Sequence, residues 1–196
     1  MKIIEDKNKN FFDKIARYYD SAFGNWIKKM QSNIIKNSKL KNNARILDAG
    51  CGTGNLLSLL EERNSFELYG IDISKEMLGI ARKKLRKTKL KIEPVEKLSF
   101  KDNFFDYIFS IDAFHHYSDK EKSMNNFYSA LKRNGKLIVV DVDFGLYLNK
   151  LFHKLEPGNN GIYDTYEMRN LFKRHNFKNI KQNKVGLFTK MTTGIK

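Results

Sequence analysis

The sequence predicts an α/β fold, a doubly wound and mostly parallel seven-stranded sheet that ends in an antiparallel C-terminal strand. Two observations predict it. Short apolar runs alternate with longer stretches in which apolar residues recur every three or four positions, which are the patterns of strands and helices. Strands separated by helices pair in parallel through right-handed crossovers. The last two apolar runs follow each other too closely for a crossover helix, so we expect them to pair antiparallel.

The expected elements follow in chain order. Residues 1–43 are expected to form an N-terminal helical arm, because apolar residues between Phe11 and Ile34 fall mostly three or four positions apart. Five strands are expected where the short apolar runs lie, at residues 45–49, 67–71, 91–95, 107–111 and 136–141. Helices are expected between and after them, at residues 55–63, 75–87, 120–131 and 165–175. The closing antiparallel hairpin is expected at residues 178–182 and 185–190.

The length of 196 residues fits a single domain. Its expected parts are the arm at 1–43, a ligand-binding core at 44–143, and a final part at 144–196 that holds a lid segment, a helix and the hairpin. No apolar run approaches the ~18 residues that a membrane-spanning helix needs. The single cysteine, Cys51, cannot form an internal disulfide. The sequence therefore favours a cytoplasmic protein without a membrane span.

The charge of the chain is strongly basic, with 37 Lys and Arg against 22 Asp and Glu and a net charge of +15. A concentrated basic face would attract nucleic acid. The basic residues are instead spread through most of the chain among many asparagines, as solvated surfaces also are. A nucleic-acid partner is therefore conceivable but not favoured.

A glycine-rich turn follows the first expected strand, in the order Asp48, Ala49, Gly50, Cys51, Gly52, Thr53, Gly54, Asn55. Glycines there let the chain turn tightly and let a ligand approach the main chain. The dinucleotide-binding pattern would place a third glycine where Asn55 stands. The Asp48 carboxylate would repel a pyrophosphate and attract an ammonium group. The turn thus favours an adenosine ligand with an ammonium group over a nicotinamide or flavin dinucleotide.

Asp72 ends the second expected strand, twenty positions after Gly52. A carboxylate at this point can accept both hydroxyls of an adenosine ribose. The alternative is that Asp72 or Ser74 only caps the following helix. Ser74 suits the cap better, which would leave Asp72 for the ribose.

Four segments resemble the motifs of a single family. They are ILDAGCGTGN, GIDIS, VEKLSFKDNFFDYIFSIDAFHH and LKRNGKLIVVD. With these, the whole chain resembles the class I S-adenosylmethionine (SAM) dependent methyltransferases, which have a Rossmann-like fold. It is most similar to the small-molecule branch that includes the ubiquinone and menaquinone biosynthesis methyltransferases. The resemblance implies SAM as the cofactor, S-adenosylhomocysteine as its product and a small-molecule acceptor.

The resemblance also implies a role for single residues. Asp48 would reach the methionine ammonium, the backbone at 50–52 would receive the amino-acid part, Asp72 would hold the ribose, and Ile73 with Met77 would line the adenine. The cofactor-binding candidates are Tyr19, Asp48, Ala49, Gly50, Cys51, Gly52, Asp72, Ile73, Met77, Pro94, Val95, Glu96 and Ser110.

Pro94 departs from the family pattern. An acidic residue often stands at the matching position and accepts from the adenine amine, whereas here Pro94 lies between Glu93 and Val95. The Val95 main-chain N–H could still bond the adenine ring. The adenine amine keeps an acceptor only if Glu93 or Glu96 takes over.

Candidates for a catalytic base lie after the fourth strand, where open α/β sheets bind their substrates. They are His115 and His116, with Asp112 as a conceivable partner. The alternative is that both histidines begin a helix and only pack beside Phe114. From the arm, Tyr18, Tyr19 and Asp20 are expected either to fold over the cofactor or to pack within the helix.

Motifs that the sequence lacks reduce the number of possible methyl acceptors. After the fourth strand there is no Asn or Asp followed by Pro-Pro and an aromatic residue, which disfavours methylation of exocyclic amines in nucleic acids. Cys51 lies in the glycine turn, so no cysteine is left for a covalent pyrimidine adduct. A magnesium site at Asp112, Asp141 and Asp143 is a minor option, and we expect no metal. The alternatives kept open are an RNA or protein methyltransferase and a non-catalytic SAM-binding protein.

Overall fold

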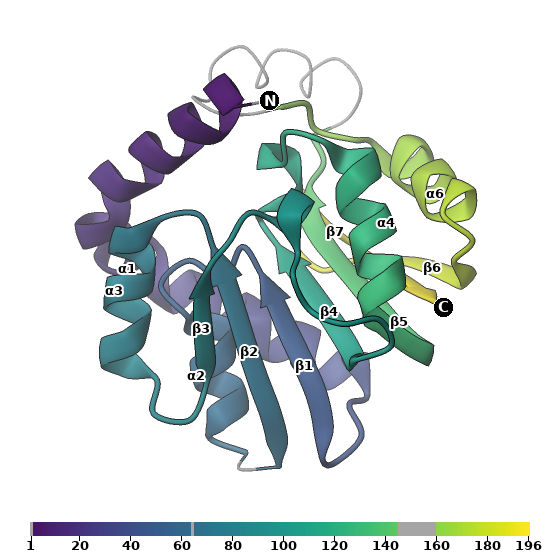
Figure 1. The fold of residues 1–196 in the computed structure, drawn as a ribbon, viewed down its shortest axis with the longest axis horizontal. Coiled ribbons are helices and arrows are strands. Elements are labelled where there is room, and N and C mark those ends of the chain that lie inside the picture. The colour runs from purple at the N-terminus through teal and green to yellow at the C-terminus, as the bar shows by residue number, and fades with distance from the viewer. Residues whose placement is uncertain (1, 64, 145–159) are drawn as a thin grey trace.

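The computed structural model describes residues 2–63, 65–144 and 160–196. Its seven strands form a single sheet in the order β3-β2-β1-β4-β5-β7-β6 (Figure 1). The strands are β1 (Ala44–Ala49), β2 (Phe66–Asp72), β3 (Lys89–Ile92), β4 (Phe105–Ile111), β5 (Leu131–Val142), β6 (Lys178–Lys184) and β7 (Thr189–Ile195). The first five pair in parallel, and β7 pairs antiparallel with both β5 and β6. The predicted fold class is confirmed.

Helices cover both faces of this sheet. They are α1 (Lys2–Ser38), α2 (Asn55–Glu61), α3 (Lys75–Lys84), α4 (Lys120–Ala130) and α6 (Thr165–Arg174), with the 3-10 turns η1 (Val95–Lys97) and η2 (Phe114–His116). Apolar residues of α1, α2 and α3 belong to one buried cluster, and those of α4 and α6 to another. Neighbouring strand residues such as Ile46 and Leu47 divide between the two clusters, because successive side chains point to opposite faces.

β5 begins at Leu131, five residues earlier than predicted, and β6 ends at Lys184, two residues later. The third and the last strands differ from the prediction in ways that have a local cause. The third ends at Ile92 instead of residue 95, because Pro94 has no N–H to continue the ladder and instead precedes η1. The last strand occupies Thr189–Ile195 instead of residues 185–190. Residues 185–188 form the hairpin connection, in which the N–H groups of Val185 and Gly186 donate to the Thr189 carbonyl. Leu187 in this connection is 73% exposed. The apolar residues at 185–188 had predicted a strand, but the chain turns there instead.

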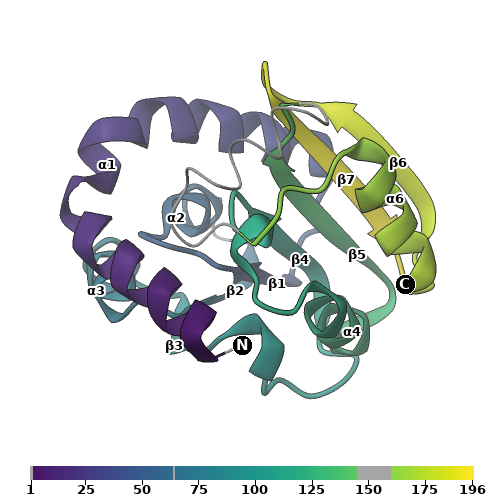
Figure 2. The same cartoon turned by 90° about the horizontal axis from the view of Figure 1, so that it is seen from above.

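The predicted helical arm is one long helix, α1. Figure 2 shows it passing α3 and then α2 along one side of the molecule. Its C-terminal half packs on the sheet through Met30, Ile34 and Ile35. No helix among the described residues is long and apolar enough to cross a membrane. Of the predicted lid segment, residues 145–159 lie outside the described part of the chain.

Candidate functional site

A cavity lies where the central parallel strands end. Its empty volume is about 990 Å³, including space open to solvent. Residues of α1 line one side of it, namely Asn8, Phe12, Tyr19, Ile27 and Gln31. The other described lining residues follow the ends of β1 to β4, at 48, 50–53, 55, 72–73, 77, 93–96, 111–113 and 116–118.

The glycine turn lies between β1 and α2 and depends on glycine for its shape. Gly50, Gly52 and Gly54 have φ angles of 74°, 51° and 78°, which side-chain-bearing residues rarely adopt. A Cβ atom on Gly50 would lie 2.6 Å from the Cβ of Ala113. The N–H groups of Gly50 and Cys51 both donate to the Ile71 carbonyl at 2.9 Å. The turn is therefore fixed against the end of β2, with its backbone at the cavity.

Two buried carboxylates, Asp48 and Asp72, line the cavity beside this turn. Burial away from water and, less strongly, the nearby Asp72 together raise the pKa of Asp48 to about 8. Burial also raises the pKa of Asp72, to about 6, although backbone N–H groups stabilise its charged form. A ligand carrying positive charge would offset the unfavourable burial of these two groups.

Asp72 also holds the main chain. One of its oxygens accepts from the Gly52 N–H and the other from the Ser74 N–H, both at 2.8 Å. Ser74 caps α3, as predicted, by accepting from the Met77 N–H. Asp72 is thus not left free by that cap. A carboxylate has about four acceptor sites, so two remain that ribose hydroxyls could use.

The residues expected near the adenine line the cavity as a group, namely Ile73, Met77, Pro94, Val95 and Glu96. The Glu96 carboxylate accepts from the backbone N–H groups of Ser118 and Asp119 and from the Ser118 hydroxyl. The Glu93 carboxylate accepts from the backbone and hydroxyl of Ser99. Both acids therefore anchor nearby loops, and the three bonds to Glu96 all go to its Oε1.

Several sequence-predicted residues, Ala49, Ser110 and Tyr18 among them, are not among the residues that line the cavity. The Tyr117 hydroxyl donates to the Ala49 carbonyl at 3.0 Å. The Ser110 and Tyr117 hydroxyls also form a hydrogen bond, at 2.8 Å. Tyr117 itself lines the cavity, so Ala49 and Ser110 contact the cavity only through the hydrogen bonds that hold Tyr117. Tyr18 is 70% exposed, whereas Tyr19 lines the cavity.

The two histidines have different surroundings. His115 is not a lining residue, and its Nδ1 lies 2.5 Å from the Asp141 carboxylate, which also accepts its backbone N–H. Asp141 was not expected from the sequence as a partner of His115. His116 lines the cavity, and its ring meets that of Phe12 edge to face, with centroids 4.9 Å apart. Of the two candidates, His116 is placed to contact a ligand.

Asp20 joins α1 to the glycine turn. Its carboxylate accepts from the Thr53 hydroxyl at 2.7 Å and from the Asn55 amide at 3.0 Å, and it pairs with Lys84 of α3 at 2.5 Å. The Lys84 and hydroxyl partners keep the pKa of Asp20 below its usual value despite partial burial. A second contact joins the Ser74 hydroxyl to Asp13 at 2.6 Å. Helix α1 is therefore attached to the rest of the cavity at two points, Asp20 and Asp13.

The sequence reasoning missed four lining residues of α1, namely Asn8, Phe12, Ile27 and Gln31. The spacing of each pair, at 8 and 12 and at 27 and 31, is one helical turn. A polar residue within an apolar helical stripe was the available signal. The described residues include no group of three or more His, Cys, Asp or Glu side chains placed to hold a metal ion.

The chain is similar to several known proteins. A demethylmenaquinone methyltransferase of Thermotoga maritima is 31% identical over 140 residues, which is 67% of this chain and 59% of that relative. A phosphoethanolamine N-methyltransferase of Haemonchus contortus, solved with SAM, superposes with a TM-score of 0.76 at 24% identity over 87% of this chain and 43% of that one. The [4+2]-cyclase SpnF superposes at 0.81 with 14% identity, covering 96% and 94%.

These similarities do not all support the same conclusion. This chain spans about three fifths of the Thermotoga relative, and the two superpositions show a shared fold. Because one of them is a cyclase, the fold alone does not name a reaction. A family model described as a methyltransferase domain matches residues 40–186, from just before β1 through β6. With that match over most of its length, the chain belongs to the methyltransferase-domain family.

Proposed function

We propose that this protein is a SAM-dependent methyltransferase that transfers a methyl group to a small-molecule acceptor. The observation that carries the proposal is the meeting of the glycine turn with two buried carboxylates, Asp48 and Asp72, in one cavity. A cofactor with an ammonium group and a ribose matches those two acids, and a ligand with a pyrophosphate does not.

The residues present fit such a cofactor. The Asp48 carboxylate would face the ammonium, the turn at 50–52 would receive the amino-acid part, and Asp72 would accept the ribose hydroxyls. Ile73, Met77 and Val95 would enclose the adenine. When bound, SAM supplies a methyl group on a positively charged sulfur. The protein's task is then to align the acceptor with that methyl and to exclude water, which can supply much of the rate enhancement.

His116 is the residue that we propose takes a proton from the acceptor. It lines the cavity, and its neighbour His115 is anchored to Asp141. The Asn8 side chain further holds this segment by donating to the His116 carbonyl at 2.7 Å. A base on a segment held this firmly can accept a proton without a large rearrangement.

The small size of the proposed acceptor follows from the position of α1, which covers one side of the cavity. Two relatives are named for small-molecule acceptors, demethylmenaquinone and phosphoethanolamine. Because α1 supplies lining residues and the core supplies the rest, we propose that residues 1–196 act as one domain. A reducing, cytoplasmic setting belongs to the same proposal and rests on the lone Cys51, which is buried with a free thiol.

Isothermal titration of the protein with SAM, S-adenosylhomocysteine and NAD tests the cofactor. We expect both SAM ligands to bind in the micromolar range and NAD not to bind. Asp72→Ala should abolish binding, because it removes the ribose acceptor and the support for the turn. Asp102→Ala, an exposed acid remote from the cavity, is the matched control. Equal binding of NAD, or no SAM binding by the intact protein, would refute the proposal.

A further inference from the structure

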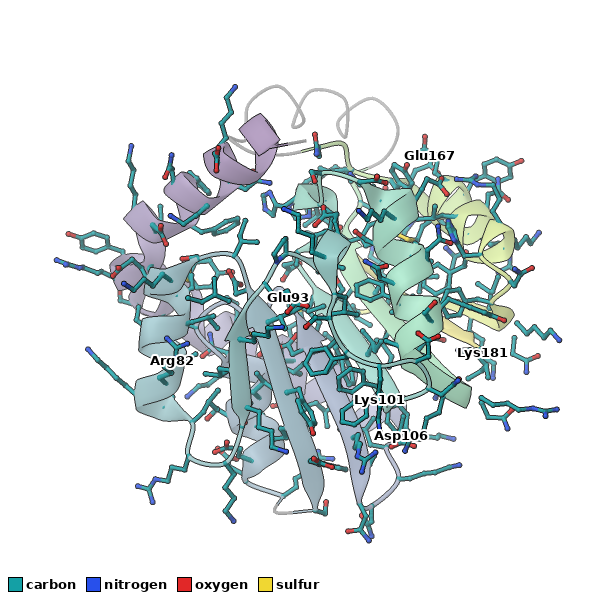
Figure 3. The ribbon with its side chains drawn as sticks, viewed as in Figure 1. Arg82, Glu93, Lys101, Asp106, Glu167 and Lys181 are labelled. Atoms are coloured by element: carbon teal, nitrogen blue, oxygen red, sulfur yellow. The ribbon has the colours of Figure 1, made fainter. Side chains whose placement is uncertain are left out.

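The charge of the cavity is opposite to that of the whole protein. The chain carries a net charge of +15, yet the described residues that line the cavity include no Lys or Arg. They include five acidic side chains, those of Asp48, Asp72, Glu93, Glu96 and Asp112, of which Asp48, with a pKa raised to about 8, mostly keeps its proton at neutral pH. Figure 3 shows Glu93 at the end of β3, while Arg82, Lys101 and Lys181 lie on outer parts of the molecule. An acceptor with a phosphate or carboxylate would find no cationic partner among these lining residues and would be repelled.

The α1 side of the cavity contains an unusual polar group at Asn8. This side chain is only 2% exposed, and its Nδ2 donates to the His116 carbonyl. That bond fixes which end of the amide is the nitrogen. The other end, Oδ1, is buried and accepts no hydrogen bond. A buried acceptor without a donor destabilises a fold, so a group of this kind calls for a ligand that donates to it.

A second amide of α1 shows the same feature. Gln31 is 8% exposed and lines the cavity, and its Oε1 also accepts no hydrogen bond. The unpartnered oxygens recorded among the described residues are these two, and both belong to residues of this cavity. The α1 side therefore offers two hydrogen-bond acceptors, Asn8 Oδ1 and Gln31 Oε1, and no cationic side chain.

The part of the cavity near Asn8 is separate from the groups that the cofactor would use. Those groups lie on the glycine turn, at the end of β2 and on η1. Asn8 instead lies beside Phe12 and His116, whose rings are in contact. An acceptor bound beside Asn8 would lie against the Phe12 ring and next to His116, the proposed base.

We propose that the methyl acceptor is a compact amine without a phosphate or carboxylate, and that Asn8 Oδ1 receives one of its N–H groups beside His116. The proposal rests on the proposed function. In the reaction the C–S bond of SAM breaks and a C–N bond forms, and the electron pair of the C–S bond stays on sulfur. The amine enters as an ammonium ion and first gives one proton to His116 and then to water, which frees its lone pair for the methyl group. The methylated nitrogen leaves as an ammonium ion, so atoms and charge balance.

An amine fits this site better than an alcohol for two reasons. A hydroxyl group has a single proton, and if it donates that proton to Asn8 Oδ1 it cannot also deliver it to His116. A primary amine that has given one proton to His116 still has two N–H groups, so it can donate one of them to Asn8 Oδ1 while its lone pair attacks the methyl group. Amines are also protonated in neutral solution, so the carboxylates of the cavity attract them.

Matched ligand pairs test the acceptor class on the intact protein loaded with S-adenosylhomocysteine. One pair is 2-phenylethylamine and 3-phenylpropanoate, and another is ethanolamine and phosphoethanolamine. We expect titration calorimetry to show at least tenfold tighter binding of the amine in each pair. Phenol and ethanol serve as the alcohol arm and should bind more weakly than the amines. Equal or tighter binding of the anions or alcohols, or no binding of any amine, would overturn the inference.

Variants at position 8 test the assigned contact. Asn8→Leu should weaken binding of 2-phenylethylamine by at least tenfold while changing SAM affinity less than twofold. Asn8→Asp keeps an acceptor oxygen and should retain amine binding. Asn10→Leu, an exposed position on the same helix, is the matched control. Loss of SAM affinity in Asn8→Leu would reassign Asn8 to the cofactor. Failure of the intact protein to bind SAM would instead reject the proposed function, so the two failures are distinguishable.

Discussion

Two regions of the cavity differ in how they are built. We call Asp48, residues 50–54 and Asp72 the floor, and Asn8, Phe12, Ile27 and Gln31 the wall. The floor is fixed by backbone hydrogen bonds between neighbouring strand ends. The wall is a helix face held over the floor by side chains such as Asp20 and Asp13. The comparison teaches that the floor is set by local turn chemistry and the wall by contacts between distant segments.

The largest effect should come from breaking the floor at Gly50. Gly50→Ala would place a Cβ 2.6 Å from Ala113 and force a side chain onto a φ of 74°. We expect the free energy of unfolding to fall by about 2–4 kcal/mol, from backbone strain and overpacking together. Urea denaturation followed by circular dichroism measures it.

Gly79→Ala is the matched control for that substitution. Gly79 lies within α3, and nothing lies within 4 Å of the Cβ it would gain. The same chemical change should therefore raise the free energy of unfolding by up to about 1 kcal/mol, as alanine does in helices. Equal effects of the two substitutions would show that the turn does not depend on its backbone conformation.

A smaller effect should follow from separating the wall from the floor. Asp20→Ala leaves the Thr53 hydroxyl, the Asn55 amide and Lys84 without this acceptor. We expect a loss of about 1–2 kcal/mol in the free energy of unfolding, because the carboxylate is only partly buried. SAM affinity should fall about tenfold, a loss of comparable free energy, and calorimetry measures it.

Asp6→Ala changes an exposed acid on the same helix and should leave both quantities unchanged. If Asp20→Ala behaved like this control, α1 would be held in place by its apolar packing, and the carboxylate would be dispensable.

The smallest effect is a pH dependence that reports the charge of the floor. Burial raises the pKa of Asp48 to about 8, above its ordinary value of 3.8. Between these values the unfolded chain has lost the proton and the folded protein keeps it, so the free energy of unfolding falls as pH rises. Relative to Asp48→Asn, the native protein should lose about 1 kcal/mol per pH unit between pH 5 and 7.

Urea denaturation at pH 5, 6 and 7 measures this difference. Asp102→Asn, at an exposed acid, should show the native slope and is the control. Saturating SAM should reduce the slope, because a nearby ammonium favours the charged carboxylate. A native slope identical to that of Asp48→Asn would mean that Asp48 is not buried as the structure shows.

How far the sequence predicts the structure depends on the range of the interactions. Short continuous apolar runs correctly placed β1, β2, β4 and β5, because strands buried on both faces require that pattern. The cap at Ser74 followed from residue type and position. The same logic failed at residues 185–188, where Val185, Leu187 and Phe188 suggested a strand, but β7 begins only at Thr189. There the pairing of β7 between β5 and β6 decided the register.

The sequence by itself determined the fold class, the glycine turn and the two acids of the floor, because periodicity and turn chemistry act over a few residues. Only the tertiary structure decided that Asp141 pairs with His115. It likewise decided that Asn8 and Gln31 bury unpartnered oxygens in the cavity. Whether a buried polar atom finds a partner depends on which distant segments pack around it, and nothing local to an asparagine in a helix encodes that.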